Sequence, residues 1–173
     1  QVVSALIALF LFLSCVESNS NQNLESDFSV VIHTSYEPNG LHPVNDFSSM
    51  RSHIYLYTHR PLLKINLETF DLEPLLVTEA PTTDDGVKYL YTLRDDITWD
   101  DSSPFTLADV LFTVKMNLHP LANNPALKPL YGSVIAGLEA HPDDANKFYL
   151  ICKEMHAGNN QILTEANILQ KTA

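Results

Sequence analysis

The chain has 173 residues, of which 45% are hydrophobic and 18% are charged, a composition typical of one globular domain rather than of a disordered segment. Its 21 acidic residues outnumber its 10 lysines and arginines, which gives a formal net charge of −11. This balance argues against a nucleic-acid-binding role, which depends on basic patches.

Residues 2–13 are apolar apart from Ser4. A run of about 12 residues is too short to span a bilayer, which needs about 20, but it has the length of the hydrophobic core of a signal peptide. A buried N-terminal helix or strand is the alternative. The polar stretch that follows is typical of a solvated tether. We therefore predict a signal peptide over residues 1–15 and a polar tether over residues 16–28.

Cys15 directly follows a small residue, Ser14, at the end of the apolar run. This arrangement resembles the bacterial lipobox, although Phe12 and Leu13 stand where the usual pattern has Leu and then a small residue. The resemblance implies lipidation of Cys15 and a membrane anchor without a transmembrane helix. Release as a soluble exported protein after cleavage nearby is the alternative. With Cys15 lipidated, Cys152 lacks a disulfide partner and is expected to be a buried thiol.

The residues after the tether predict short strands alternating with helices. We expect a strand over 29–34, a loop over 35–43, a helix over 46–59 that begins near Asp46 or Ser48, and a strand over 62–66 followed by a turn and return. Asp84-Asp85-Gly86 predicts a hairpin-type turn, because this sequence tolerates positive φ.

The strand predicted over 87–93 places Val87, Tyr89, Tyr91 and Leu93 on one face. Further along, 123–129 is predicted as a loop, 130–138 as a short helix or strand, 148–152 as a strand, and 160–171 has a helical pattern. Alternating short strands and helices indicate an α/β or α+β domain.

The clearest pattern is a strand, an acidic turn and a helix over residues 91–120. Thr106 is a suitable N-cap and Asp109 stands three residues later, as in a capping box. One helix face is apolar, and Pro120 ends the helix. The apolar face holds Leu107, Val110, Leu111, Val114 and Leu118, with Asp109, Thr113 and Asn117 opposite.

Chemical motifs are sparse. The seven histidines form no HExxH or i,i+4 pair, and no GxSxG or phosphate-binding glycine loop is present. Asp95-Asp96 and Asp100-Asp101 flank Trp99 and could be paired catalytic carboxylates, but they fit turn formation better. We therefore predict no catalytic residue, no metal site and no cofactor.

The loop over 35–43 follows the first predicted strand, and ligands bind at that edge of open α/β sheets. Tyr36 offers an aromatic ring and Glu37 a charge, while the backbone before Pro38 could pair with an extended ligand. An exposed connection without a binding role is an equally good interpretation of the same residues.

Several of these motifs together resemble the extracytoplasmic solute-binding proteins, family 5, of ABC transporters. The most specific are Leu93-Arg94, Trp99-Asp100, Pro104-Phe105-Thr106 and Ala108-Asp109-Val110-Leu111-Phe112. Leu41-His42-Pro43 resembles the family's Leu-Asp-Pro, with His42 in place of the acid, and Asp101 replaces the glycine that usually follows Trp-Asp.

The resemblance implies an α/β fold of the periplasmic-binding-protein-like type II. Family members are considerably longer than this chain, so residues 29–173 are expected to be an incomplete N-terminal portion of solute-binding lobe I. The resemblance implies a monomeric receptor of an ABC importer that captures peptides or similar small solutes for membrane permease subunits. It further implies that this receptor is held in the periplasm or at the cell surface. Thr34, Ser35, Tyr36 and Glu37 would contact the ligand.

Two alternatives come from other functional classes. The chain could belong to an exported hydrolase whose catalytic part lies beyond these residues, or to a surface-anchored adhesion or scaffold domain. A nucleophile motif elsewhere in the protein would favour the hydrolase.

Overall fold

The computed structural model describes residues 31, 33, 36–38, 40–46 and 48–171. The chain divides into two units, Gln1–His33 and Thr34–Ala173, and the architecture below is that of the second. The predicted signal peptide, Cys15 and the tether lie outside the described residues, as does most of the strand expected over 29–34. Within the described part of the chain, no helix has the length and apolarity needed to cross a membrane.

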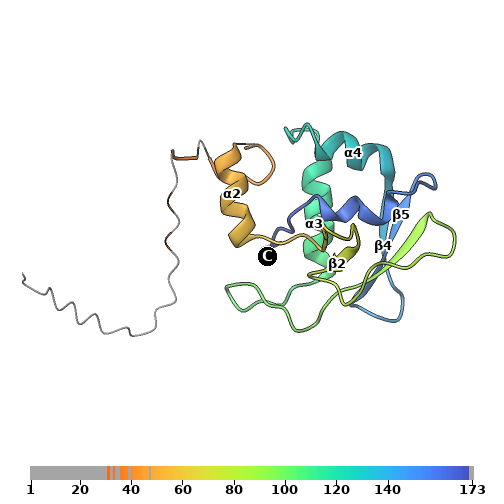
Figure 1. Cartoon of the computed structure of the whole chain (residues 1–173). Helices are drawn as coiled ribbons and strands as arrows, with labels where there is room; N and C mark the ends of the chain where they lie inside the picture. Colours follow the sequence, from red (N-terminus) through yellow and green to blue (C-terminus); the bar gives the residue numbers. More distant parts are fainter. Residues whose placement is uncertain (1–30, 32, 34–35, 39, 47, 172–173) are drawn as a thin grey trace, which may run out of the picture. The chain divides into compact units, whose positions relative to one another are not determined.

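Two small sheets form the strand layer (Figure 1). Strands β1 (Leu63–Ile65) and β2 (Leu72–Pro74) make an antiparallel hairpin, and β3 (Lys88–Thr92), β5 (Lys147–Cys152) and β4 (Ile135–Ala140) make an antiparallel sheet with β5 in the centre. These elements confirm the predicted strands over 62–66, 87–93 and 148–152. Gly86, at the turn before β3, has φ 69°, as the predicted turn requires.

The helices are α2 (Ser49–Thr58), α3 (Leu107–Leu118) and α4 (Leu127–Val134), with a 3-10 helix, η1, over Asn159–Thr164. Figure 1 shows α4 following the carboxyl end of α3 and leading directly into β4. Ser48 caps α2 by accepting a hydrogen bond from Arg51 N at 3.2 Å, so one of the two predicted start points is confirmed.

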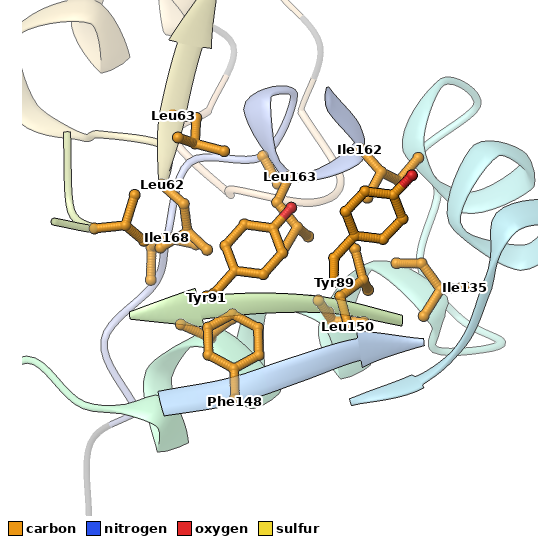
Figure 2. Close-up of a cluster of buried hydrophobic side chains, with 14 of the residues drawn as sticks. Leu62, Leu63, Tyr89, Tyr91, Ile135, Phe148, Leu150, Ile162, Leu163 and Ile168 are labelled. Carbon is orange, nitrogen blue, oxygen red and sulfur yellow. The ribbon is translucent and has the colours of Figure 1, made fainter. Parts of the chain in front are cut away.

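The core lies between β3, β5, η1 and the residues leading into β1. Tyr91 and Phe148, which are cross-strand partners, stack with their ring centroids 5.0 Å apart. Figure 2 shows Leu62, Leu163 and Ile168 packed around Tyr91 from segments far apart in the sequence. Of the four residues predicted to share one face of this strand, Tyr89, Tyr91 and Leu93 are buried and Val87 is half-buried. Cys152 is a buried free thiol, as expected, and burial raises its pKa.

Asp109 is a buried carboxylate that joins three segments, although it lies only in the first turn of α3. Its Oδ2 accepts hydrogen bonds from Thr106 N at 2.9 Å and from Trp99 Nε1 at 3.4 Å, while Oδ1 accepts from Lys171 N at 2.7 Å. Thr106 and Asp109 form the predicted capping box. Neutral donors thus compensate the burial of this charge.

Two further polar residues of α3 also hold neighbouring segments in place. Thr113, which is fully buried, donates to Asp109 O at 2.8 Å and accepts from Leu169 N at 2.9 Å. Asn117 accepts from Asn124 Nδ2 at 2.9 Å, which fixes the loop before α4. The sequence places these polar residues opposite the apolar face, but the structure buries them together with Val110 and Val114 and leaves the three leucines of the apolar face half-buried. The polar residues are buried because residues 165–171, the C-terminal segment, cover them.

Two boundaries predicted from the sequence are wrong. The helical pattern over 160–171 continues only to Thr164, because the amides of Ile168, Leu169 and Lys171 donate to Arg60 O, Thr113 Oγ1 and Asp109 Oδ1 instead of to carbonyls one turn earlier. The loop predicted over 123–129 also ends early: Asn124 Oδ1 accepts from Leu127 N at 2.9 Å and so helps to start α4.

We expect Asp109→Ala to lower the free energy of unfolding of the chain by about 3 kcal/mol, because it leaves partly buried donors on three segments without their acceptor. Urea unfolding followed by the fluorescence of Trp99, the single tryptophan, measures this. Asp95→Ala, at an exposed acid of the same region, is the control and should change stability by less than about 0.5 kcal/mol. Equal losses in the two variants would contradict the role of Asp109.

Candidate functional site

An open groove of about 570 Å³ lies beside α3, and we call it the groove. Its walls come from the loop before α2, the end of α2, the acidic turn, α3 and the C-terminal segment. The lining residues are His42, Pro43, Thr58, His59, Arg60, Leu76, Ile97, Thr98, Trp99, Asp100, Phe105, Phe112, Met116, Ile168, Leu169 and Gln170.

One wall of the groove is aromatic. Trp99 and Phe105 meet edge to face, with their ring centroids 6.3 Å apart and their planes at 69°. The turn that carries them closes through an antiparallel bridge between Thr98 and Pro104, and Ser102 takes the positive φ of 66° that the turn needs. A rigid aromatic surface of this kind binds apolar parts of a ligand at low entropic cost.

Two of the four acids of this turn, Asp96 and Asp101, make hydrogen bonds that fit the structural role predicted from the sequence. Asp96 pairs with Arg94 at 2.6 Å, and the hydrogen bonds from Arg94 lower the pKa of Asp96. Asp101 accepts from Ser103 Oγ at 2.6 Å and from Gln170 Nε2 at 2.7 Å, and these bonds lower its pKa, with that of the Ser103 hydroxyl the largest cause.

The opposite wall is polar and comes from the end of α2. The ring of His59 stacks on Tyr55 with 3.9 Å between centroids, and its Nδ1 lies 2.8 Å from Thr58 Oγ1. Burial lowers the pKa of His59, and the nearby charge of Arg51 lowers it further. His59 is therefore neutral at pH 7, and Arg60 and Asp100 are the charged side chains of the groove.

Among the described residues of the loop predicted to bind ligand, His42 and Pro43 line the groove. His42 Nδ1 accepts hydrogen bonds from Val44 N and Asn45 N, both at 3.1 Å, which orders the turn before α2. Tyr55 Oη donates to Leu41 O at 2.9 Å and holds the loop on α2. This part of the loop is a fixed portion of the groove wall.

Of the four residues predicted to contact ligand, two are described. The side chain of Tyr36 is 56% exposed, and its hydroxyl lies 2.6 Å from Ser49 Oγ at the start of α2. Glu37 is exposed, and neither residue lines the groove. Thr34 and Ser35 lie outside the described residues. The assignment of all four as ligand contacts stays a prediction.

No motif in the sequence indicated the groove residues at the end of α2 or in the C-terminal segment. His59 and Arg60 precede Pro61, where a helix must end, so their position at a helix terminus could have been inferred. The approach of the C-terminal segment to α3 could not have been inferred from the sequence, because backbone amides of that segment, rather than a sequence motif, make the contacts with Thr113 and Asp109. Among the described residues, no three or more His, Cys, Asp or Glu side chains are grouped for a metal ion.

The fold and the acidic turn together indicate one protein family. The sequence profile of the bacterial extracellular solute-binding proteins, family 5 (middle part), matches residues 71–167, more than half of the chain. The chain belongs to this family.

A curated relative is the oligopeptide-binding protein OppA of Bacillus subtilis (strain 168), which is 29% identical over 109 residues. This match covers 63% of the chain but 19% of the relative. Among solved structures, OppA of Listeria monocytogenes bound to peptide superposes with a TM-score of 0.66 at 15% identity, covering 79% of this chain and 30% of that one.

The periplasmic binding protein AgaA of A. tumefacien R10, in complex with agropinic acid, superposes with a TM-score of 0.65 at 20% identity. It covers 77% of this chain and 26% of AgaA. At these identities the structures establish a shared fold, which confirms the predicted periplasmic-binding-protein-like class. The chain spans about a fifth to three tenths of the length of these relatives.

We expect His59 to titrate below the ordinary histidine value of about 6.5, because its folded pKa is lowered. Between that lowered pKa and 6.5 the unfolded chain binds more protons, so stability falls as the pH drops through this window. NMR of the imidazole Cε1 signal against pH measures the titration. Tyr55→Phe keeps the stacked ring and should leave the low pKa in place, whereas Tyr55→Ala should raise it. A normal pKa in the parent chain would contradict the stacked, half-buried arrangement.

Proposed function

We propose that the whole protein is the extracytoplasmic substrate-binding component of an ABC importer, which captures peptides or similar small solutes and delivers them to a membrane permease. The observation that carries this proposal is the family match over residues 71–167, which includes the acidic turn and α3. The B. subtilis relative is named an oligopeptide-binding protein, and the Listeria structure holds a peptide.

We propose that the loop and the groove form the contact surface for the solute in this portion of the protein. Tyr36 presents an exposed ring whose hydroxyl lies 2.6 Å from Ser49 Oγ, and the backbone before Pro38 would pair with an extended ligand. The groove adds an aromatic wall of Trp99 and Phe105 beside polar residues. A mostly apolar surface with a few polar groups accepts solutes of varied side-chain chemistry.

Binding without catalysis is the part of the proposal that the acidic turn supports. The family and its structural neighbours are binding proteins. The Asp96 and Asp101 carboxylates are engaged by Arg94 and Ser103, which leaves them as turn supports rather than as a general acid and base. The hydrolase alternative has no such observation in its favour.

Export and anchoring belong to the same proposal. The apolar run over 2–13 would direct export, and lipidation of Cys15 would hold the monomeric receptor at the periplasmic or outer cell surface. An anchored receptor meets its permease by diffusion in two dimensions, so it needs only weak affinity for that partner. Mass spectrometry of the membrane-extracted protein would detect the lipid on Cys15.

The test is calorimetric titration of the whole protein with peptides of graded length and with small amphipathic solutes. We expect at least one class to bind, and uptake of the labelled ligand into cells to require the protein. Tyr36→Ala should weaken binding roughly three- to tenfold through loss of ring contact. Tyr57→Ala, at an equally exposed tyrosine of α2, should leave the affinity unchanged.

The outcomes separate function from site. Absence of binding by every solute class, together with unchanged uptake when the gene is deleted, would contradict the receptor function. Binding that survives Tyr36→Ala unchanged would leave the function in place and exclude Tyr36 from the contact surface.

A further inference from the structure

The tip of the β1–β2 hairpin, residues 66–71, exposes two large apolar side chains that are three residues apart. Leu67 is 84% exposed and Phe70 is 74% exposed. Neither lines the groove or joins the hydrophobic core. Single exposed apolar residues are ordinary, but two on a six-residue tip form a local patch.

The backbone conformation at Phe70 is unfavourable for a phenylalanine. Phe70 has φ 62°, in the left-handed region that glycine occupies without penalty and that is unfavourable for a bulky aromatic residue. Only two non-glycine residues among those described have positive φ, and the other, Ser102, is a small polar residue. Neither backbone preference nor packing within the described fold explains a phenylalanine here.

The tip is nevertheless held in one shape. Asn66 Oδ1 accepts hydrogen bonds from Glu68 N at 2.8 Å and Thr69 N at 3.1 Å, and Asn66 O accepts from Phe70 N at 2.8 Å. Asn66 N donates to Asp71 O at 2.9 Å, which closes the turn onto the hairpin. A preorganised turn presents its apolar side chains with little further ordering of the backbone on binding, so the remaining cost is that of the side-chain rotamers.

The charges of the hairpin restrict what can cover it. Lys64 is paired with Glu73 at 2.7 Å, so Glu68 and Asp71 give the tip a net negative charge. An anionic bilayer surface would repel these carboxylates. A second copy of the chain would bring the same acids together across a two-fold axis, which is also unfavourable. An apolar pocket bordered by lysines or arginines on another protein fits both features.

We propose that the hairpin tip is a docking element, in which Leu67 and Phe70 enter an apolar, basic-rimmed pocket on the extracytoplasmic face of the membrane permease. This inference rests on the proposed function, which requires that partner. Phe70 would be the central anchor, as aromatic residues are at protein interfaces, and Glu68 and Asp71 would contribute charge complementarity at the rim.

The experiment measures binding of the whole protein to its permease in lipid nanodiscs by surface plasmon resonance, with stimulation of ATP hydrolysis as a second readout. Phe70→Gly and Leu67→Ser should each weaken docking about tenfold or more. Leu121→Ser, at a leucine that is 83% exposed outside the hairpin, is the matched control and should dock as the parent does. Glu68→Gln should weaken docking and reduce its salt dependence.

Two further measurements are made on the same variants. Phe70→Gly should leave solute affinity unchanged in calorimetry, and its urea midpoint should be no lower than that of the parent, because glycine relieves the strained φ. A role of Phe70 in holding the protein's own fold would lower that midpoint instead.

Each outcome decides the inference. Docking that is equal in the parent, Phe70→Gly and Leu67→Ser overturns it. A lowered urea midpoint for Phe70→Gly also overturns it, because this would mean that Phe70 packs within its own polypeptide. Self-association of the parent in sedimentation, if Phe70→Gly abolishes it, would likewise overturn it, because the tip would then bind a second copy of the protein. If the parent binds no solute and docks on no permease, the proposed function fails as well. If the parent binds solute and the variants dock as the parent does, only the role of the hairpin is overturned.

Discussion

The buried carboxylate of Asp109 ties together parts of the chain that share no sheet. It accepts hydrogen bonds from the start of α3, from Trp99 in the acidic turn and from Lys171 in the C-terminal segment. A buried charge is tolerated only when donors surround it, so the three segments have to be in place together. The aromatic wall of the groove therefore depends on the same residue that caps α3, and loss of Asp109 would disturb the site as well as the fold.

The C-terminal segment completes this arrangement without forming a helix or strand of its own. Ile168 N donates to Arg60 O on one side, while Leu169 N donates to Thr113 Oγ1 on the other. The segment thereby lies between the end of α2 and the polar face of α3, and it contributes Gln170 to the groove. Side chain to backbone bonds of this kind satisfy an irregular segment that has no ladder partner.

Local chemistry made much of the fold predictable. The capping box at Thr106, the turn at Gly86 and the alternation through Tyr89 and Tyr91 each depend on residues close in sequence, and each is confirmed. The end of the helical pattern near Thr164 and the groove itself depend on contacts more than 50 residues apart, such as Leu169 with Thr113, and no local pattern contains them. The family was predictable because its motif lies in that same local turn, whereas the ligand contacts expected at Tyr36 and Glu37 stay a prediction.

The central claim is that the polar face of α3 holds the C-terminal segment and so forms the groove. Native-state hydrogen exchange of the amides of Leu169 and Lys171 tests it most directly. The account predicts protection of the same order as in the central strand β5, although neither amide belongs to a helix or strand. Exchange as fast as in the exposed turn over 141–146 would contradict it.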